Sequence, residues 1–181
     1  MNKNWPHALR VDERLAETTR PFLNATCAEM QLSPEESDRL VEPVLGLASY
    51  ILRLVPVPGL VGIAGSQGSG KSTITELVAL ALERGRGLKV ARLSIDDFYL
   101  PKAERMTLGR TVHPLLKTRG VAGTHDMVLM GQVIDSLLGG QDVQTPRFNK
   151  AVDDREPEPE AILGPVDYVL VEGWCVGALP E

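Results

Sequence analysis

Residues 65–72 read Gly65-Ser66-Gln67-Gly68-Ser69-Gly70-Lys71-Ser72 and match the pattern G-x-x-x-x-G-K-[ST] at every fixed position. Glycines at these places let the backbone turn so that several N–H groups point inward at phosphate oxygens. The same pattern places a lysine within reach of the β- and γ-phosphates and a hydroxyl where it can ligate Mg²⁺. We call residues 65–72 the phosphate loop and predict that it binds a nucleotide.

The segments on either side of the phosphate loop fit this prediction. Residues 60–64 form a short apolar run typical of a buried strand, and residues 71–84 have the spacing of an amphipathic helix that Gly85 and Gly87 end. A helix that starts at the end of the loop turns its positive dipole end toward the phosphates. Thr73 is therefore also a predicted nucleotide contact, although it reads equally well as an ordinary first-turn helix residue.

Strands and helices continue to alternate after the phosphate loop. Residues 88–95 and 166–171 read as a second and a third strand, and residues 126–138 as a helix. Residues 101–124 read as a loop-rich insert, and residues 152–159 as an acidic loop. Strand–helix–strand alternation with apolar strands indicates an α/β fold with a parallel sheet, of which three core strands are visible.

The N-terminal residues 7–55 carry helical patterns instead. Ser33-Pro34-Glu35-Glu36 is a helix start, because serine can cap, proline suits the first helical position and Glu36 follows the cap by three. We expect Pro21 to interrupt the preceding helix and Pro43 to kink or split the following one. These helices are expected to act as a packing element.

Composition narrows the class of partner and the compartment. The 181 residues include 19 Lys and Arg and 24 Asp and Glu, a net charge of −5, so no global basic field attracts nucleic acid or an anionic membrane. Cys27 and Cys175 are far apart, which favours a reducing compartment. The N-terminus lacks the apolar run of a signal peptide, and no stretch supplies the ~20 apolar residues of a membrane span. We expect a cytoplasmic protein that binds a small molecule, not nucleic acid or membrane.

Acidic residues follow two of the predicted strands. Asp96 and Asp97 come after the second strand, where a carboxylate can orient or deprotonate a substrate hydroxyl, or simply cap the next turn. Glu172 ends the third strand and suits a Mg²⁺ ligand of the Walker-B kind, unless it is only a solvent-exposed strand-end residue. Asp167 lies at the opposite end of that strand and is given no such role.

Five segments together resemble the P-loop kinases of the phosphoribulokinase, uridine kinase and pantothenate kinase superfamily, and within it the D-glycerate 3-kinase family. They are GSQGSGKST (65–73), SIDDFYLP (94–101), RGVAGTHD (119–126), PRFNKAVDDR (146–155) and EGWCVG (172–177). The resemblance implies a P-loop NTPase sheet and transfer of a phosphoryl group from ATP, with Mg²⁺, to a small polar acid. D-glycerate, giving 3-phosphoglycerate, is the acceptor that it implies.

The resemblance also implies roles for individual residues. Asp96 matches the base or acceptor-orienting group, with Asp97 as second choice, and Glu172 matches the acidic residue near magnesium. The implied acceptor-binding residues are Arg119, Thr124, His125, Asp126, Arg147 and Lys150. A carboxylate substrate needs an arginine fork or a lysine charge, which agrees with the cations in this set. Asp126 reads equally well as a helix N-cap, and His125 as a turn or surface histidine.

Relatives in this family continue beyond the length of the present sequence, so further strands and a lid are expected to follow Glu181. On this view residues 1–55 form an N-terminal helical extension and residues 56–181 an incomplete P-loop kinase core. The strand before the phosphate loop would then have an exposed edge that favours self-association. Two alternatives stay open: a kinase of a nucleoside or pantothenate, and a catalytically incomplete nucleotide-binding fragment. The aromatic content of 4% mildly favours a small polar acid over a nucleoside.

Overall fold

The structure, a computed structural model, describes residues 9–178 and divides the chain into two compact units. The first unit combines Met1–Arg92 with Val166–Glu181, and the second is Leu93–Pro165. The N-terminal segment, in which no signal peptide is expected, lies outside the described residues. The first two residues of the predicted helical region 7–55 also lie outside them.

Two long helices open the first unit: α1 (Glu13–Glu29) and α2 (Pro34–Leu54). The predicted helix start at Ser33 is confirmed, because its side chain accepts from the Glu36 N–H and the Glu36 side chain accepts from the Ser33 N–H. The interruption expected at Pro21 is wrong, and Pro43 does not split its helix, since both prolines lie inside continuous helices. The kink expected at Pro43 stays a prediction. Both helices pack against α3 (Lys71–Arg86), and burial there offsets the one hydrogen bond that each proline removes.

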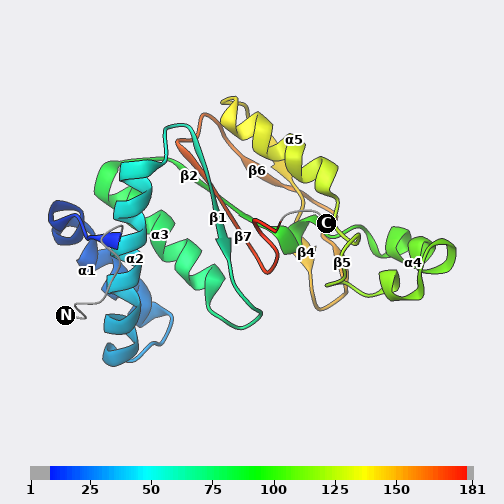
Figure 1. The fold of residues 1–181 in the computed structure, drawn as a ribbon, viewed down its shortest axis with the longest axis horizontal. Helices are drawn as coiled ribbons and strands as arrows, with labels where there is room; N and C mark the ends of the chain where they lie inside the picture. The colour runs from blue at the N-terminus through cyan, green and yellow to red at the C-terminus, as the bar shows by residue number, and fades with distance from the viewer. Residues whose placement is uncertain (1–8, 179–181) are drawn as a thin grey trace. The chain divides into compact units, whose positions relative to one another are not determined.

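The sheet of the first unit confirms the predicted parallel α/β arrangement. Its strands are β1 (Gly59–Ala64), β7 (Tyr168–Gly173) and β2 (Val90–Ser94), in the order β1-β7-β2 (Figure 1). β1 runs parallel to β7, with the register Gly59↔Tyr168 to Ala64↔Gly173. All six residues of the central strand β7 are buried, whereas β1 alternates and leaves Leu60 48% exposed.

Helix α3 begins at Lys71 of the phosphate loop and runs two residues past its predicted end. Its left-handed C-cap is Gly87, with φ of 66°, so Gly85 is a helical residue and not the terminator. Gly85 is needed for a different reason: a Cβ there would lie 2.2 Å from Leu15 Cδ1 of α1. The buried core between these helices and the sheet includes Leu15, Leu23, Val41, Leu45, Leu77, Leu82, Tyr168 and Leu170.

The second unit contains more regular structure than its sequence predicts. The insert predicted to be loop-rich contains helix α4 (Lys102–Thr111), which starts without a side-chain cap and so lacks the usual sequence signal. The predicted helix near residue 126 is confirmed as α5 (Met127–Leu138). The remaining elements are η2 (Ile95–Phe98), η3 (Pro114–Lys117) and two short antiparallel pairs, β3 (Val143–Thr145) with β6 (Glu160–Ile162) and β4 (Phe148–Asn149) with β5 (Asp154–Arg155).

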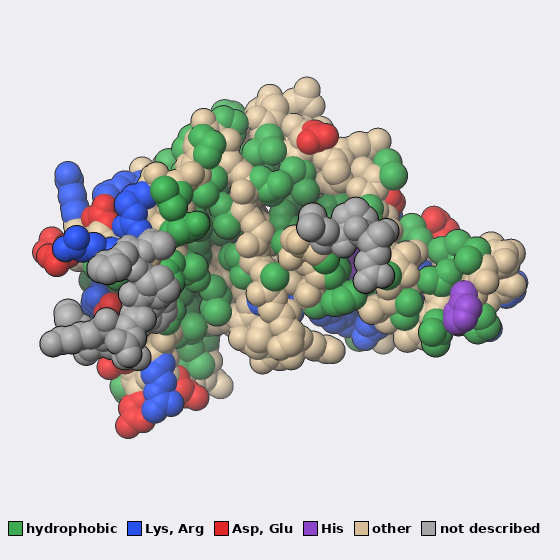
Figure 2. Space-filling view, viewed as in Figure 1, with side chains coloured by type: hydrophobic (Ala, Val, Ile, Leu, Met, Phe, Trp, Pro, Cys, Tyr) green, Lys and Arg blue, Asp and Glu red, His purple; other side chains and the backbone are tan. Residues whose placement is uncertain are grey.

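The surface of the first unit carries apolar side chains near the end of α2 and along β1. Leu54 is 61% exposed and Val57 55% exposed, and hydrophobic side chains are visible over this region in Figure 2. Among the described residues, no helix is both long enough and apolar enough to cross a bilayer.

Candidate active site

The phosphate loop has the backbone that its glycines predict. Gly68 and Gly70 have φ of 76° and 79°, in the left-handed region that residues with a side chain rarely adopt. A Cβ on either residue would meet no atom within 4 Å, so conformation and not crowding requires glycine there. The side chains of Ser66, Gln67 and Ser69 are exposed, which leaves the loop open to a ligand.

The loop passes directly into the N-terminus of α3. Gly70 is the N-cap, and within the described part of the chain no side chain caps this helix. The first-turn N–H groups of a helix lack partners inside the helix, so those of α3 are left to a ligand. These N–H groups and the positive end of the helix dipole suit an anion such as a phosphate.

Three of the predicted residues meet beside this helix start. Ser72 Oγ donates to Glu172 Oε1 at 2.9 Å, and Lys71 Nζ lies 3.7 Å from Glu172 Oε2. The side chains of Lys71 and Glu172 are 17% and 10% exposed, so Glu172 is not a solvent-exposed strand-end residue. Asp167, at the other end of β7, accepts the Lys89 N–H at 2.7 Å and so has a structural role.

A second group of predicted residues gathers around Asp96 in the second unit. Lys150 Nζ lies 2.7 Å from Asp96 Oδ2, although the two residues are far apart in sequence. Tyr99 follows Asp96 by three residues in a tight 3₁₀ turn, which places the two side chains on the same side. Burial, together with the charge and hydrogen bond of Asp96, raises the pKa of Tyr99 to about 12. Tyr99 is therefore a neutral neighbour of the Asp96 carboxylate at physiological pH.

His125 packs against this tyrosine. The two rings are stacked with centroids 4.1 Å apart and an interplanar angle of 24°. Its Nε2 is buried and has no hydrogen-bond partner among residues 9–178. Burial lowers the pKa of His125, while the nearby charge of Asp96 acts in the opposite direction. His125 is thus a partly enclosed ring and not an exposed surface histidine.

Asp97 and Arg147 form an ion pair. Asp97 Oδ2 lies 2.7 Å from Arg147 Nη1, and Asp97 Oδ1 accepts the Phe148 N–H at 3.1 Å. Arg147 also pairs with Glu160 through Nε. These contacts tie the η2 turn to β4 and β6. Of the two adjacent aspartates, Asp96 is therefore the one that faces the lysine of the predicted acceptor-binding set.

Thr124 and Asp126 also have local partners. The buried Thr124 hydroxyl donates to the Val121 carbonyl at 2.6 Å. Asp126 is the N-cap of α5, and its side chain accepts the Leu129 N–H at 3.0 Å. It also forms an ion pair with Arg155 at 3.3 Å. The geometry thus supports the interpretation of Asp126 as a helix cap.

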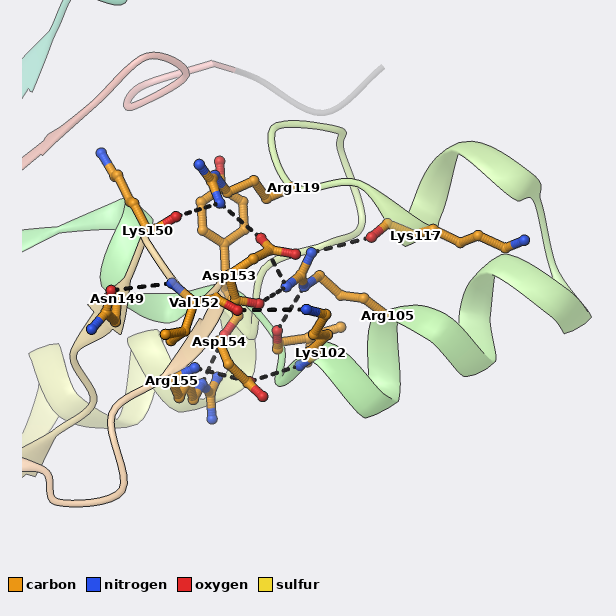
Figure 3. A network of polar contacts seen from close by, with 12 residues as sticks. Lys102, Arg105, Lys117, Arg119, Asn149, Lys150, Val152, Asp153, Asp154 and Arg155 are labelled. Carbon is orange, nitrogen blue, oxygen red and sulfur yellow. Dashed lines mark hydrogen bonds and ion pairs between the residues drawn. The ribbon is translucent and has the colours of Figure 1, made fainter.

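Arg119 belongs to a polar network that the sequence does not reveal (Figure 3). Its Nη1 lies 2.8 Å from Asp153 Oδ1, and Asp153 in turn pairs with Arg105 of α4 at 3.2 Å. Sequence reasoning missed Arg105, Asp153 and Tyr99. The spacing of Tyr99 from Asp96 is the one signal in the sequence that could have indicated where Tyr99 lies. Nothing in the local pattern signals that the side chain of Arg105 is buried.

The chain is similar in sequence to several kinases. No protein-family model matches the chain. An uncharacterised kinase of Schizosaccharomyces pombe is 37% identical over 134 residues, covering 68% of this chain and 48% of the relative. The chloroplastic D-glycerate 3-kinase of Arabidopsis thaliana is 33% identical over 68% of this chain and 29% of its own length. A pantothenate kinase of Streptococcus gordonii is 30% identical over 68% of this chain and 39% of its own length.

A solved structure shows the same relationship in three dimensions. The D-glycerate 3-kinase of Cryptococcus neoformans var. grubii superposes with a TM-score of 0.62 and 34% identity, covering 73% of this chain and 49% of that one. The chain belongs to the P-loop kinase superfamily. The chain spans about half the length, or less, of the three curated relatives that it matches above.

Proposed function

We propose that the chain takes part in phosphoryl transfer from ATP to a hydroxyl of a small polar acid, with D-glycerate as the acceptor. The observation that carries the proposal is the meeting of Lys71, Ser72 and Glu172 at the start of α3. Loop N–H groups and the helix dipole would hold the phosphates, and the Lys71 ammonium would neutralise charge on the transferred group. Catalysis of this kind depends mainly on positioning and electrostatics.

The residues at this point fit a magnesium ion. Ser72 and Glu172 offer hydroxyl and carboxylate oxygens, the ligands that Mg²⁺ prefers, and Mg²⁺ usually takes its remaining ligands from water and substrate phosphates. Among the described residues there is no cluster of three or more His, Cys, Asp or Glu that could hold a metal ion. When bound, the ion would supply positive charge to the phosphates.

Asp96 is the proposed partner of the acceptor hydroxyl. Its carboxylate could accept a hydrogen bond from that hydroxyl, orient it and take its proton. In the present structure the carboxylate is paired with Lys150, whose side chain is 60% exposed and so open to a ligand. Lys150 and Arg119 are cations able to bind the carboxylate of an acid. Arg147 is a weaker candidate because Asp97 and Glu160 already surround it.

One assay tests the reaction and its acceptor. The chain is incubated with ATP and Mg²⁺ in the presence of D-glycerate, pantothenate, uridine or no acceptor, and ADP release is measured. We expect release that depends on D-glycerate. Release that depends on pantothenate would instead favour the second candidate, which the similarity to streptococcal pantothenate kinases supports.

A third outcome would favour nucleotide binding without catalysis. Calorimetry can measure ATP binding by the same preparation, and the phosphate loop predicts that ATP binds more tightly than AMP. Binding without turnover on any acceptor would contradict the proposed reaction for this chain and leave a nucleotide-binding role.

A further inference from the structure

Arg119 is held on one side only. Its Nη1 contacts Asp153 at 2.8 Å and the Lys150 carbonyl at 3.3 Å, and its guanidinium lies 5.9 Å from the centre of the Phe148 ring. Within residues 9–178, neither Nε nor Nη2 of Arg119 has a hydrogen-bond partner, and the side chain is 35% exposed. One edge of the guanidinium is therefore fixed, and the other is available to a ligand.

Asp153 makes this contact from a left-handed backbone conformation. Its φ of 58° lies in the region that few residues other than glycine adopt, Asn and Asp being among those that adopt it most often. Its carboxylate forms ion pairs with Arg119 and Arg105. Its backbone carbonyl accepts a hydrogen bond from Arg105 Nη2 at 2.6 Å. The orientation of Asp153 thus depends on Arg105.

Arg105 cannot touch a ligand itself. Its side chain is completely buried, with Nε donating to the Leu100 carbonyl at 3.0 Å and Nη1 to the Lys117 carbonyl at 3.2 Å. All three guanidinium nitrogens are engaged, since Nη2 contacts Asp153 (Figure 3). Any effect of Arg105 on a ligand must therefore act through Asp153.

We propose that Asp153 and Arg105 are positioning residues that hold Arg119 as a receptor for the carboxylate of an acid acceptor. A guanidinium pinned along one edge presents its remaining N–H groups in a fixed plane, which matches the two oxygens of a carboxylate. Arg119 also lies close enough to Tyr99, the neighbour of Asp96, to influence its ionisation. The inference rests on the proposed function in that the acceptor is an acid.

Binding of D-glycerate, measured by calorimetry with the intact 181-residue chain, tests the proposal. Asp153→Asn keeps the shape of the side chain but removes the charge that fixes Arg119. We expect the dissociation constant to rise about tenfold, the loss of one hydrogen bond to a charged group. We expect Arg119→Lys to have a similar effect. The double variant should bind no more weakly than either single variant, because both changes remove the same interaction.

Asp154→Asn is the matched control. Asp154 is the neighbour of Asp153 in the sequence and accepts the N–H groups of Lys102 and Arg155, but it has no contact with Arg119, so this change should alter D-glycerate binding by less than about twofold. Circular dichroism and the thermal midpoint report whether each variant folds. Arg119→Lys keeps the proposal testable if Asp153→Asn fails to fold.

The outcomes separate this inference from the proposed function. Absence of D-glycerate binding by the unaltered chain, unchanged binding in Arg119→Lys, or additive losses in the double variant would overturn the receptor. D-glycerate binding that requires Arg119 and Asp153, without phosphorylation, would leave the receptor standing and contradict the proposed reaction.

Discussion

Lys71 holds a positive charge between a carboxylate and the place proposed for phosphate. In the structure Glu172 lies 3.7 Å from its ammonium, and Ser72 donates to the same carboxylate. A bound triphosphate would compete with Glu172 for this charge. We expect the lysine to matter more for the ligand than for the fold, because Ser72 can still donate to Glu172 Oε1 when the lysine is removed.

Replacement of Lys71 by alanine is expected to abolish ADP release while the chain stays folded. Loss of one group that stabilises transition-state charge typically costs about 100- to 1,000-fold in turnover. Steady-state kinetics and circular dichroism check the two parts. Lys102→Ala, which removes an exposed lysine of the second unit, is the control and should leave turnover unchanged. Turnover similar to the unaltered chain in Lys71→Ala would contradict the mechanism.

The adjacent aspartates should separate into one chemical and one structural residue. Asp96→Asn removes the proposed base and is expected to lower turnover by at least about 100-fold with little change in stability. Asp97→Asn weakens the contacts to Arg147 and the Phe148 N–H, and is expected to lower the free energy of unfolding by about 1–3 kcal/mol. Kinetics and urea denaturation measure both variants. A larger loss of turnover in Asp97→Asn would reverse the assignment.

His125 predicts a loss of stability in mild acid. Burial depresses its folded-state pKa below the ordinary value of 6.5, so the folded state binds the proton less readily than the unfolded chain. The stabilisation is present above pH 6.5 and is lost as the pH falls toward the folded-state pKa. We expect the thermal midpoint to decrease as the pH is lowered below 6.5. The decrease should be smaller in His125→Phe, which keeps an aromatic ring against Tyr99. His113→Asn, which alters an exposed histidine, should behave like the unaltered chain.

At the scale of elements, the start of α2 offers a direct test of local structure. Ser33→Ala removes the side-chain half of the capping box and should lower the free energy of unfolding by about 1 kcal/mol. Urea denaturation measures this change. Ser33→Asp keeps an acceptor for the Glu36 N–H and should retain most of the stability. Equal stability of Ser33→Ala and the unaltered chain would show that the cap contributes nothing.

Elements with a local signal were predictable, and elements held by distant partners were not. A signal within a few neighbouring residues predicts the phosphate loop, the cap at Ser33 and the apolar strand β7. Helix α4 does not, because it has no capping side chain and its anchor Arg105 finds Asp153 at a separation of 48 residues.

The candidate site divides in the same way. The residues from 65 to 73, Asp96 and Glu172 follow from the motif and from strand ends. Their partners do not: Asp97 meets Arg147 at a separation of 50 residues, and the pairing of Asp96 with Lys150 likewise needs the folded chain. Composition and spacing name candidate residues, but they cannot say which charges neutralise one another.

At the scale of the whole molecule, the chain is built from two units, and the second is an insertion between two segments of the first. The division into residues 1–55 and 56–181 stays a prediction. In the first unit, α1 and α2 pack on the same helix that follows the phosphate loop. Within the described residues, β1 lies at the edge of its sheet and pairs with β7 alone.

This edge predicts that the isolated chain associates with itself. An edge strand presents unpaired N–H and C=O groups, and β1 adds the exposed Leu60. We expect light scattering to give a mass that rises with concentration. Leu60→Lys should reduce this rise, since an edge lysine opposes strand pairing. A monomeric mass at all concentrations of the unaltered chain would contradict the prediction.

The burial of Arg105 has a consequence for how the second unit opens. Its guanidinium reaches carbonyl groups of three segments, at residues 100, 117 and 153. None of these segments can separate without leaving a desolvated charge short of a partner, which is costly. We therefore expect the three segments to open together as one cooperative substructure. Their amide hydrogens should then exchange with solvent at a common rate.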